Sequence, residues 1–272
     1  YEWQPKLMKV ANDLGVACFS TPFDNEAVDF MESMNMPIYK IASFEITDIN
    51  LIRYAASKCK PMIISTLVKV IRENLYTERD ERCLAEIEDI ELALNACREE
   101  GNNDITLLKC TSDYPATLEK ANLLTMVDMR EKFGVKVGLS DHSMTNTIPI
   151  VAVALGATVG EKHFVLDRKL GGIDSAFSLD PTEFSSMVNA VREVEKSLGN
   201  VTYEVSDSDK GRRRSLYVAE DMKAGDMITD KNVRSVRPGF GLHPKFYNEI
   251  MGKKVIREMK KGERIHLGDI II

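Results

Sequence analysis

The sequence predicts an α/β protein: a TIM-type β/α barrel with about six of its eight βα units, followed by a small β-rich domain. Three observations predict this fold class. Through roughly the first 200 residues, short apolar runs alternate with amphipathic helical stretches. Polar residues gather at the carboxyl end of every apolar run. Near residue 199 this pattern gives way to polar, turn-rich sequence and then to short β-type runs.

The barrel portion begins with a helix, "WQPKLMKVANDLG" (3–15), and six strands can be placed after it. Strands that alternate with helices are parallel and joined by crossover helices. Near-continuous apolar runs fit strands that are covered on both faces. The expected strands are 15–21, 37–43, 61–66, 105–112, 135–142 and 157–164.

The polar strand ends favour a closed barrel over an open doubly wound sheet. A barrel gathers all of its strand ends into one mouth, whereas an open sheet uses mainly those at its switch point. Because a complete barrel needs eight units, about two are expected to be missing on the N-terminal side. The polar ends are Ser20-Thr21, Lys40 with Ser43, Ser65-Thr66, Lys109 with Thr111-Ser112, Ser140-Asp141-His142 and Glu161-Lys162-His163.

The chain is expected to divide into a barrel (1–198), a linker (199–213) and a small β-rich domain (214–272). The linker is polar and turn-rich, as flexible connections are. Two similar phrases in the small domain, "DMKAGDMITDKNV" and "EMKKGERIHLGDI", indicate an internal pseudo-repeat.

Composition excludes several classes of protein. The apolar and charged fractions, 44% and 29%, are those of an ordinary globular protein. A net charge of −6, offset by no basic cluster but 212–214, argues against a nucleic-acid partner. No apolar run approaches the roughly 18 residues of a membrane span, and no signal-peptide core is present, so we expect no membrane partner and a cytosolic location. Five cysteines without metal-type spacing indicate free thiols.

Two of the four histidines, His142 and His163, follow successive strands, and each lies near a carboxylate, Asp141 or Glu161. A barrel brings these strand ends side by side. Imidazole with carboxylate suits a divalent ion such as Mn²⁺, with water or substrate oxygens completing its shell. The two carboxylates would either orient the rings or bind the ion directly. The alternative is a pair of structural histidines.

Two lysines and two further carboxylates are also candidates. Lys40 and Lys109 are both expected to face the mouth, where an ammonium group within an apolar strand needs an anion. That anion is either an anionic substrate or a salt-bridge partner, Glu45 or Asp113. Glu45 and Asp174 are candidate general acids or bases, or ordinary loop residues. Nearby hydroxyls favour phosphate or carboxylate binding, and they belong to Ser43, Thr111, Ser112 and Ser140.

Seven phrases follow one another along the chain: "FSTPFD", "YKIASFEITDI", "LLKCTSDYPA", "GLSDHS", "EKHFVLDR", "GGIDSAFSL" and "VRPGFGLHP". In this order they resemble the sialic acid synthase family, and the resemblance spans nearly the whole chain. That family joins a β/α barrel to a C-terminal SAF (antifreeze-like) domain. Within it, "KIASFEITDI" and "EKHFVLDR" are more similar to the pseudaminic acid synthase branch than to the N-acetylneuraminate or legionaminate branches.

The resemblance implies a metal-dependent transferase that condenses phosphoenolpyruvate with an amino-sugar aldehyde. The products would be a nine-carbon 2-keto acid and phosphate. In the pseudaminate branch the sugar is 2,4-diacetamido-2,4,6-trideoxy-L-altrose. The implied cofactor is Mn²⁺, with Mg²⁺ or Co²⁺ as alternatives. Matched motif by motif, the implied roles are metal binding and catalysis for His142 and His163, acidic active-site positions for Glu45 and Asp174, and substrate contacts for Lys40, Ser43, Ser112, Tyr114, Ser140 and Glu161.

The resemblance also implies a domain-swapped homodimer. In the family the SAF domain closes the active site of the partner subunit, and its arginine, here Arg237, reaches the N-acyl group of the sugar. The alternatives are an N-acetylneuraminate or legionaminate synthase, or an inactive fragment that binds sugar or dimerises.

Two departures from the family pattern stand out. The first two βα units, which in the family carry a catalytic glutamate, have no counterpart among the phrases. After "PMIIST" the usual glycine and short loop are replaced by "LVKVIRENLYTERDERC" (67–83), a charged insertion or replacement. Leu67 in the glycine position predicts a disturbed turn, because glycine tolerates backbone angles that leucine does not.

Overall fold

A computed structural model describes residues 1–67 and 85–271. Apart from Leu67, the unusual segment 67–83 lies outside the described residues, and so does Cys83. Leu67 is buried, and its carbonyl oxygen accepts a hydrogen bond from the Ala85 N–H at 3.1 Å. Its φ is not positive, unlike that of Asn35 or Cys59, so Leu67 adopts a backbone conformation that leucine tolerates. The predicted disturbance of the turn after β2 stays a prediction.

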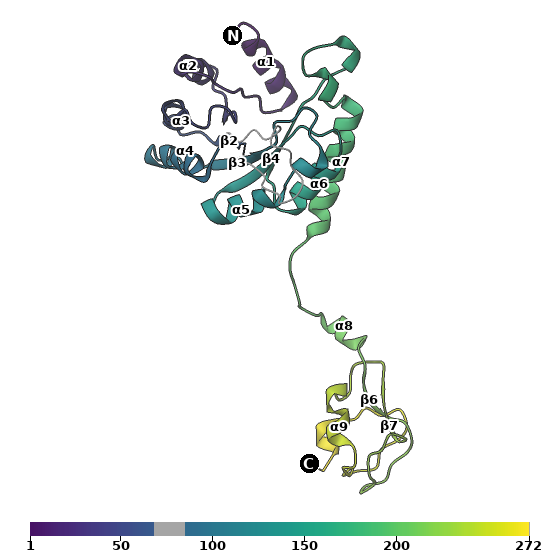
Figure 1. Ribbon diagram of the computed structural model, residues 1–272. Coiled ribbons are helices and arrows are strands. Elements are labelled where there is room, and N and C mark those ends of the chain that lie inside the picture. Colours follow the sequence, from purple (N-terminus) through teal and green to yellow (C-terminus); the bar gives the residue numbers. More distant parts are fainter. Residues whose placement is uncertain (68–84, 272) are drawn as a thin grey trace. The chain divides into compact units, whose positions relative to one another are not determined.

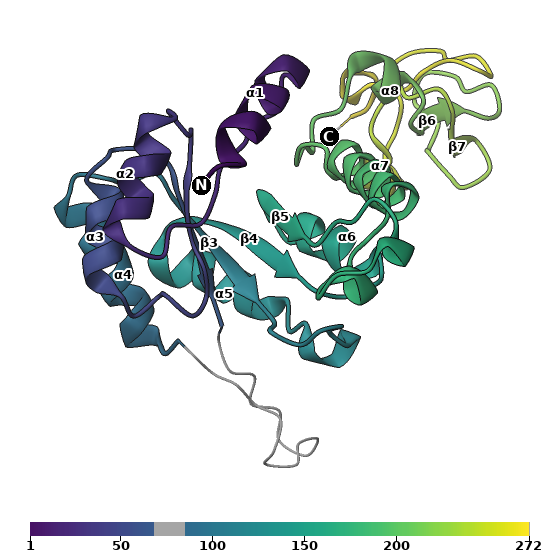
Figure 2. The same cartoon turned by 90° about the horizontal axis from the view of Figure 1, so that it is seen from above.

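The chain divides into two compact units, Tyr1–Gly199 and Asn200–Ile272. The first unit is a curved parallel sheet with helices around its outer side (Figures 1 and 2). Every neighbouring pair of strands is parallel, in the order β1 (Tyr39–Ile41), β2 (Met62–Thr66), β3 (Ile105–Cys110), β4 (Lys136–Asp141) and β5 (Val159–Lys162). The predicted β/α-barrel architecture is confirmed, as an open half-barrel over the described residues.

Helices precede the sheet and connect its strands, as the alternating sequence pattern predicts. Local sequence signals set their ends: Asp24 caps α2 by accepting from the Ala27 N–H, and Asp180 with Glu183 forms a capping box at the start of α7. Gly134 ends α5 with a φ of 64°. The helices are α1 (Gln4–Leu14), α2 (Asn25–Ser33), α3 (Ile49–Ala56), α4 (Ile87–Glu99), α5 (Leu124–Phe133), α6 (Thr147–Ala154) and α7 (Pro181–Leu198).

The strand expected at 15–21 is reduced to a single bridging residue. Ser20 pairs with Tyr39 of β1 in the parallel sense. Val16 is 59% exposed, so this segment has no second neighbour to bury its other side among the described residues. An edge segment with one short partner has too few backbone hydrogen bonds to be a full strand.

Side chains along the strands alternate between a helix-facing face and an interior face. On β2, β3 and β4 the helix-facing positions are fully buried against the helices. The interior positions include Ser65, Leu108 and Ser140. The helix-facing set that belongs to the main core comprises Met62, Ile64, Ile105, Leu107, Val137 and Leu139. This alternation decides which residues reach the mouth.

The second unit is a small β module with its own core. It contains α8 (Asp207–Gly211), the antiparallel pair β6 (Ser215–Val218) and β7 (Val233–Val236), and α9 (Tyr247–Ile250). Its core is formed by eleven buried residues within 200–271, among them Leu216, Val233 and Val255. A module with this separate core is the β-rich C-terminal domain that the sequence predicts.

The two repeated phrases of this module pair with each other. Met222 and Met259, at equivalent positions in the phrases, exchange both backbone hydrogen bonds at 2.8 and 2.9 Å. Each phrase then turns in the same way. The Lys223 N–H donates to the Asp226 side chain at 2.7 Å, and the Lys260 N–H donates to the Glu263 side chain at 2.8 Å. The pseudo-repeat is therefore a structural repeat.

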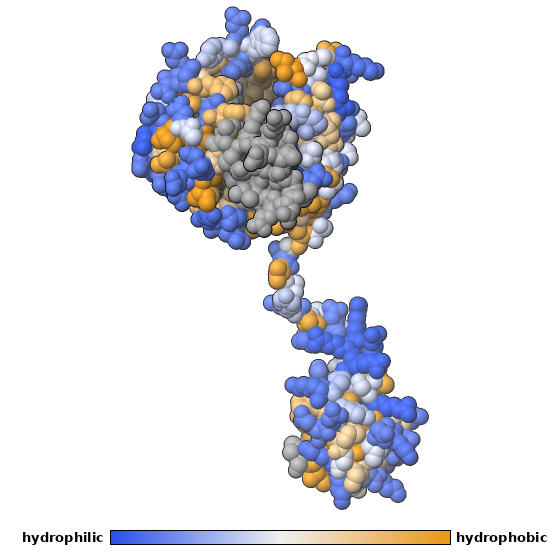
Figure 3. Space-filling view, viewed as in Figure 1, coloured by the Kyte–Doolittle hydropathy of each residue, from blue (hydrophilic) through white to orange (hydrophobic). Residues whose placement is uncertain are grey.

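Hydrophilic residues cover much of the visible surface of each unit, with hydrophobic residues between them (Figure 3). The loop after β5 is unusually apolar, since Leu166, Leu170 and Ile173 are each more than 70% exposed.

Within the described ranges, no helix has the length and apolar character needed to cross a membrane. The four cysteines outside the undescribed segment are free thiols, as predicted.

A matched pair of glycines tests the packing of β4 against β5. A Cβ at Gly138 would overlap the Val159 carbonyl oxygen and lie 2.7 Å from Cδ2 of Leu108, whereas a Cβ at Gly160 would have nothing within 4 Å. We expect Gly138→Ala to lower the free energy of unfolding by about 1–3 kcal/mol and Gly160→Ala to change it by less than about 0.5 kcal/mol. Urea unfolding of both variants measures this difference. Equal costs would contradict the packing described.

Candidate active site

The carboxyl ends of the strands carry polar side chains on the interior face. Lys40 lies between the helix-facing core residues Tyr39 and Ile41, so it points inward from β1. Ser140 and Glu161 point inward from β4 and β5, where they are partners in the ladder. The sequence placed these residues at one mouth, and the structure joins them directly.

A hydrogen-bonded network links these three residues. The Ser140 hydroxyl donates to Oε1 of Glu161 at 2.7 Å, and the Lys40 ammonium lies 3.3 Å from Oε2. Lys40 therefore pairs with Glu161, and the alternative partners considered for it, Glu45 or Asp113, are wrong. Because both oxygens of Glu161 have partners, this carboxylate is held in place and acts as an acceptor within the network.

His142 and His163 lie side by side, as the barrel interpretation predicts, with ring centroids 5.1 Å apart. Nδ1 of His142 is 2.7 Å from the Thr111 carbonyl oxygen, so it donates there and leaves Nε2 with a free lone pair. Burial lowers the pKa of His142 and favours this neutral form, since the ring is 4% exposed. Asp174 lies 3.8 Å from Nδ1 of His163.

Two aromatic rings border the histidines. The Tyr114 ring lies 4.3 Å from that of His142, and the Phe177 ring lies 5.2 Å from that of His163. The two aromatic rings also contact each other at 5.0 Å. Burial raises the pKa of the Tyr114 hydroxyl, which therefore stays protonated at neutral pH. Tyr114 was predicted from the sequence, whereas Phe177, within "GGIDSAFSL", was missed because nothing in its spacing marks it.

The remaining predicted residues of this unit are on loops that follow the strands. Ser43 and Glu45 are on the loop that follows β1; Ser43 is 6% exposed, and Oε2 of Glu45 is buried without a hydrogen-bond partner among the described residues. The Ser112 hydroxyl lies 3.7 Å from the Cys110 sulfur. Ser65, on the interior face of β2, also buries a hydroxyl that has no partner in the described part of the chain. Ser65 was not among the predicted site residues.

Lys109 does not face the mouth, so that prediction is wrong. It pairs with Thr66 in the ladder, and the Thr66 hydroxyl contacts Met129 of α5, on the helix-facing side. The Lys109 ammonium donates to the Thr111 hydroxyl and to the Lys120 carbonyl oxygen. It is 1% exposed, and burial lowers its pKa to about 8. Its predicted alternative partner, Asp113, is paired with Lys120 at 2.6 Å instead.

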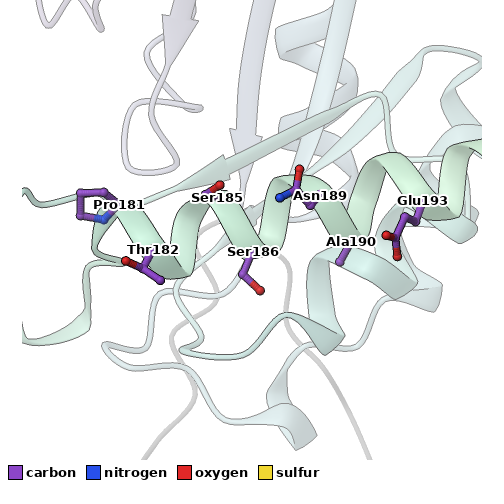
Figure 4. Close-up of a pocket in the computed structure, with 7 residues that line it drawn as sticks. All are labelled: Pro181, Thr182, Ser185, Ser186, Asn189, Ala190 and Glu193. Carbon is purple, nitrogen blue, oxygen red and sulfur yellow. The ribbon is translucent and has the colours of Figure 1, made fainter.

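Two further features belong to other elements of the chain. Arg237 is an exposed residue of the second unit, just after β7, and its predicted role stays a prediction. A shallow hollow runs along one side of α7 (Figure 4). None of the residues that line this hollow was predicted to belong to a site. The lining residues are Pro181, Thr182, Ser185, Ser186, Asn189, Ala190 and Glu193.

The donor chemistry of the two histidines fits a divalent ion. A neutral His142 with Nδ1 occupied offers Nε2, and His163 offers a second imidazole beside it. Over the part of the chain that the structure describes, no group of three or more His, Cys, Asp or Glu residues is arranged to hold a metal. The protein would therefore supply two ligands, and water or substrate would supply the others.

Comparisons with known proteins identify what this chain resembles. The NeuB family matches residues 1–75 and 82–203, and the SAF domain matches residues 213–271. The pseudaminic acid synthase of Campylobacter jejuni subsp. jejuni serotype O:2 is 44% identical over 272 residues, which cover 99% of this chain and 75% of that protein. The pseudaminic acid synthase of Helicobacter pylori is 42% identical over 273 residues, with 99% and 76% covered.

A solved structure agrees with these sequence matches. The crystal structure of the spore coat polysaccharide biosynthesis protein SpsE from Bacillus subtilis is similar with a TM-score of 0.65 and 31% identity. The similarity covers 100% of this chain and 78% of that one.

The buried Lys109 predicts a measurable pH dependence. Its pKa is about 8 in the folded protein against 10.5 for an ordinary lysine, so between these values only the unfolded chain holds the proton. Stability therefore rises across this range, and Lys109→Met removes the effect. The difference in unfolding free energy between wild type and variant should shift by about 3 kcal/mol in favour of wild type. Urea titrations across the range, with exposed Lys136→Met as control, measure it; a constant difference would contradict the prediction.

Proposed function

This chain belongs to the NeuB family, and on that premise we propose that it is a pseudaminic acid synthase. The reaction joins phosphoenolpyruvate to 2,4-diacetamido-2,4,6-trideoxy-L-altrose and yields a nine-carbon 2-keto acid and phosphate. The observation that carries the proposal is the identity of 44% and 42% to two pseudaminic acid synthases over 99% of the chain. Because phosphoenolpyruvate is a metabolite of the cytosol, the proposal includes a cytosolic location.

Binding of phosphoenolpyruvate is assigned to polar side chains at or just after the ends of β1, β3 and β4. Phosphoenolpyruvate carries a phosphate and a carboxylate, so it needs an ammonium group and hydroxyl donors. Lys40 supplies the ammonium, held toward the interior by Glu161 at 3.3 Å. The proposed hydroxyl donors are Ser43, Ser112 and Ser140.

A divalent ion, Mn²⁺ in our proposal and Mg²⁺ or Co²⁺ as alternatives, would be held by His142 and His163. When bound, it supplies a Lewis acid that polarises the aldehyde of the sugar. The chain's own contribution is orientation: the Thr111 carbonyl oxygen fixes the tautomer of His142, and Asp174 lies beside Nδ1 of His163.

The reaction balances with one water. The C3 atom of phosphoenolpyruvate forms a bond to the aldehyde carbon, whose oxygen takes up a proton, and C2 becomes an oxocarbenium-like cation. Water adds to C2 and loses a proton, and the C2–O bond to phosphate then breaks to leave the ketone while the hydroxyl proton passes to the departing phosphate. Glu45, whose Oε2 is buried without a partner among the described residues, is our candidate to stabilise the cation or to accept the proton of the water.

The sugar is assigned to the side of the mouth where Tyr114 and Asp174 lie. Tyr114 and Phe177 offer an apolar wall beside the histidines, and Asp174 offers a hydrogen-bond acceptor. We further propose a homodimer in which Arg237 of one subunit reaches the N-acyl group of the sugar in the other. A guanidinium group suits that role because it donates to carbonyl oxygens in a fixed geometry.

Release of inorganic phosphate tests the proposed reaction. This chain is assayed with and without Mn²⁺, with the altrose sugar and with N-acetylmannosamine. A second protein carries, ahead of this chain, the N-terminal segment of the Campylobacter relative, which tests the expectation that about two βα units are missing on that side. We expect Mn²⁺-dependent release with the altrose sugar. Release only with N-acetylmannosamine would favour the neuraminate alternative, and silence from both proteins would favour a fragment that only binds sugar or dimerises.

Glu45→Gln tests the proposed role of the buried carboxylate. The amide keeps the shape of the side chain but cannot accept a proton or offset a cation, so we expect the turnover number to fall by about 100-fold or more. Affinity for Mn²⁺ should be retained, because Glu45 is not among the assigned ligands. The exposed Glu88→Gln on α4 is the control. Near wild-type turnover in Glu45→Gln would remove Glu45 from the mechanism.

A further inference from the structure

A buried ion pair lies directly behind the two histidines. Oδ2 of Asp141 and Nζ of Lys162 are 2.6 Å apart, and their side chains are 5% and 3% exposed. The two residues are partners at the last rung of the ladder between β4 and β5. His142 is the next residue after Asp141, and His163 is the next after Lys162. The pair therefore sits immediately before both rings in the chain.

Strand alternation places this pair on the face opposite the mouth. Asp141 follows the helix-facing core residues Val137 and Leu139 at intervals of two, whereas Ser140 and His142 take the other parity. Lys162 likewise alternates with Glu161 and His163. The pair lies in the layer between the sheet and the helices. Asp141 and Lys162 line a small cavity there together with Pro149 and Ala152 of α6.

The same two side chains also fix the backbone on the far side of His142. Oδ1 of Asp141 accepts from the Ser143 N–H at 2.8 Å, and the Lys162 ammonium donates to the Ser143 carbonyl oxygen. The ammonium also lies 3.4 Å from the Ser143 hydroxyl. Residues 141 and 143 are thus both tied to Lys162, with His142 between them. A single ammonium group links the backbone segments that carry both rings.

Stability alone is a weak reason for this arrangement. Burying two charges costs desolvation, and an apolar pair of similar volume usually packs in such a layer with equal or greater stability. Unlike an apolar pair, this ion pair makes directional hydrogen bonds to the backbone around His142. Displacement of a metal-binding ring by a fraction of an ångström weakens binding, and loss of such supporting contacts typically costs 10- to 100-fold in affinity.

We propose that Asp141 and Lys162 are positioning residues that set the separation and orientation of the His142 and His163 rings. They do so from behind the sheet, without contact with substrate. The inference rests on the proposed function only for its metal-affinity readout. The orientation of the rings is a property of the metal-free chain and is measured separately.

The experiment compares the double variant Asp141→Asn/Lys162→Met with wild type. Both charges are removed together, so no unpaired buried charge remains to unfold the protein. The matched control is Lys136→Met, which breaks an exposed ion pair with Asp104 (2.8 Å) at the other end of β4. The readouts are the melting temperature, Mn²⁺ affinity by electron paramagnetic resonance, and ¹⁵N NMR of the histidine rings.

We expect the double variant to stay folded, to bind Mn²⁺ about 10-fold or more weakly, and to show changed ring signals for His142 and His163. His266, which is in the second unit and outside the loop that carries Arg237, serves as an internal reference and should not change. The control should match wild type in all three readouts. Lys162→Arg keeps the charge but shifts the donor, and it should give an intermediate loss of about 3- to 10-fold in affinity.

Unchanged ring signals and an affinity within twofold of wild type in the double variant would overturn the proposal. If the double variant fails to fold, Lys162→Arg decides by the same two readouts. If wild type binds no Mn²⁺, the metal role in the proposed function fails, and the NMR comparison alone decides whether the pair positions the rings. Loss of affinity with unchanged ring signals would also overturn it.

Discussion

The alternation of side chains along the parallel strands is the constraint on which the rest of this molecule depends. One face of each strand must fill the layer against the helices, so Met62, Leu107 and Leu139 are buried there. The other face converges on the interior, where the strand ends present Lys40, Ser140 and Glu161. Alternate positions along a strand face opposite sides of the sheet, so the position of a residue in this alternation decides whether it faces the helices or the mouth.

Much of the fold and half of the site follow from the sequence because they depend on short-range rules. Five of the six expected strands are present, and the two histidines meet because they end neighbouring strands. The paired repeats of the second unit follow from their similarity, since equal turns bring Met222 and Met259 together. In each case spacing along the chain translates directly into position in space.

The remaining features depend on contacts that spacing does not encode. The parity of Lys109 was available in the sequence, because Leu107 is two residues before it, but the polar character of the strand end suggested the wrong face. Glu161, the partner of Lys40, lies on β5, at the opposite end of the strand order from β1. Phe177 reaches the site only because its loop folds back over His163, and no local signal records that return.

The two sides of the mouth differ in whether their polar atoms have hydrogen-bond partners. On the β4 and β5 side, Ser140, Glu161 and His142 all have hydrogen-bond partners, so those groups are held before any ligand binds. On the β1 and β2 side, Oε2 of Glu45 and the Ser65 hydroxyl are buried without partners among the described residues. Buried polar atoms without partners are costly and are few in native proteins. The polar atoms of a ligand would relieve that cost, so a ligand at the mouth would gain most from contacts on the β1 and β2 side.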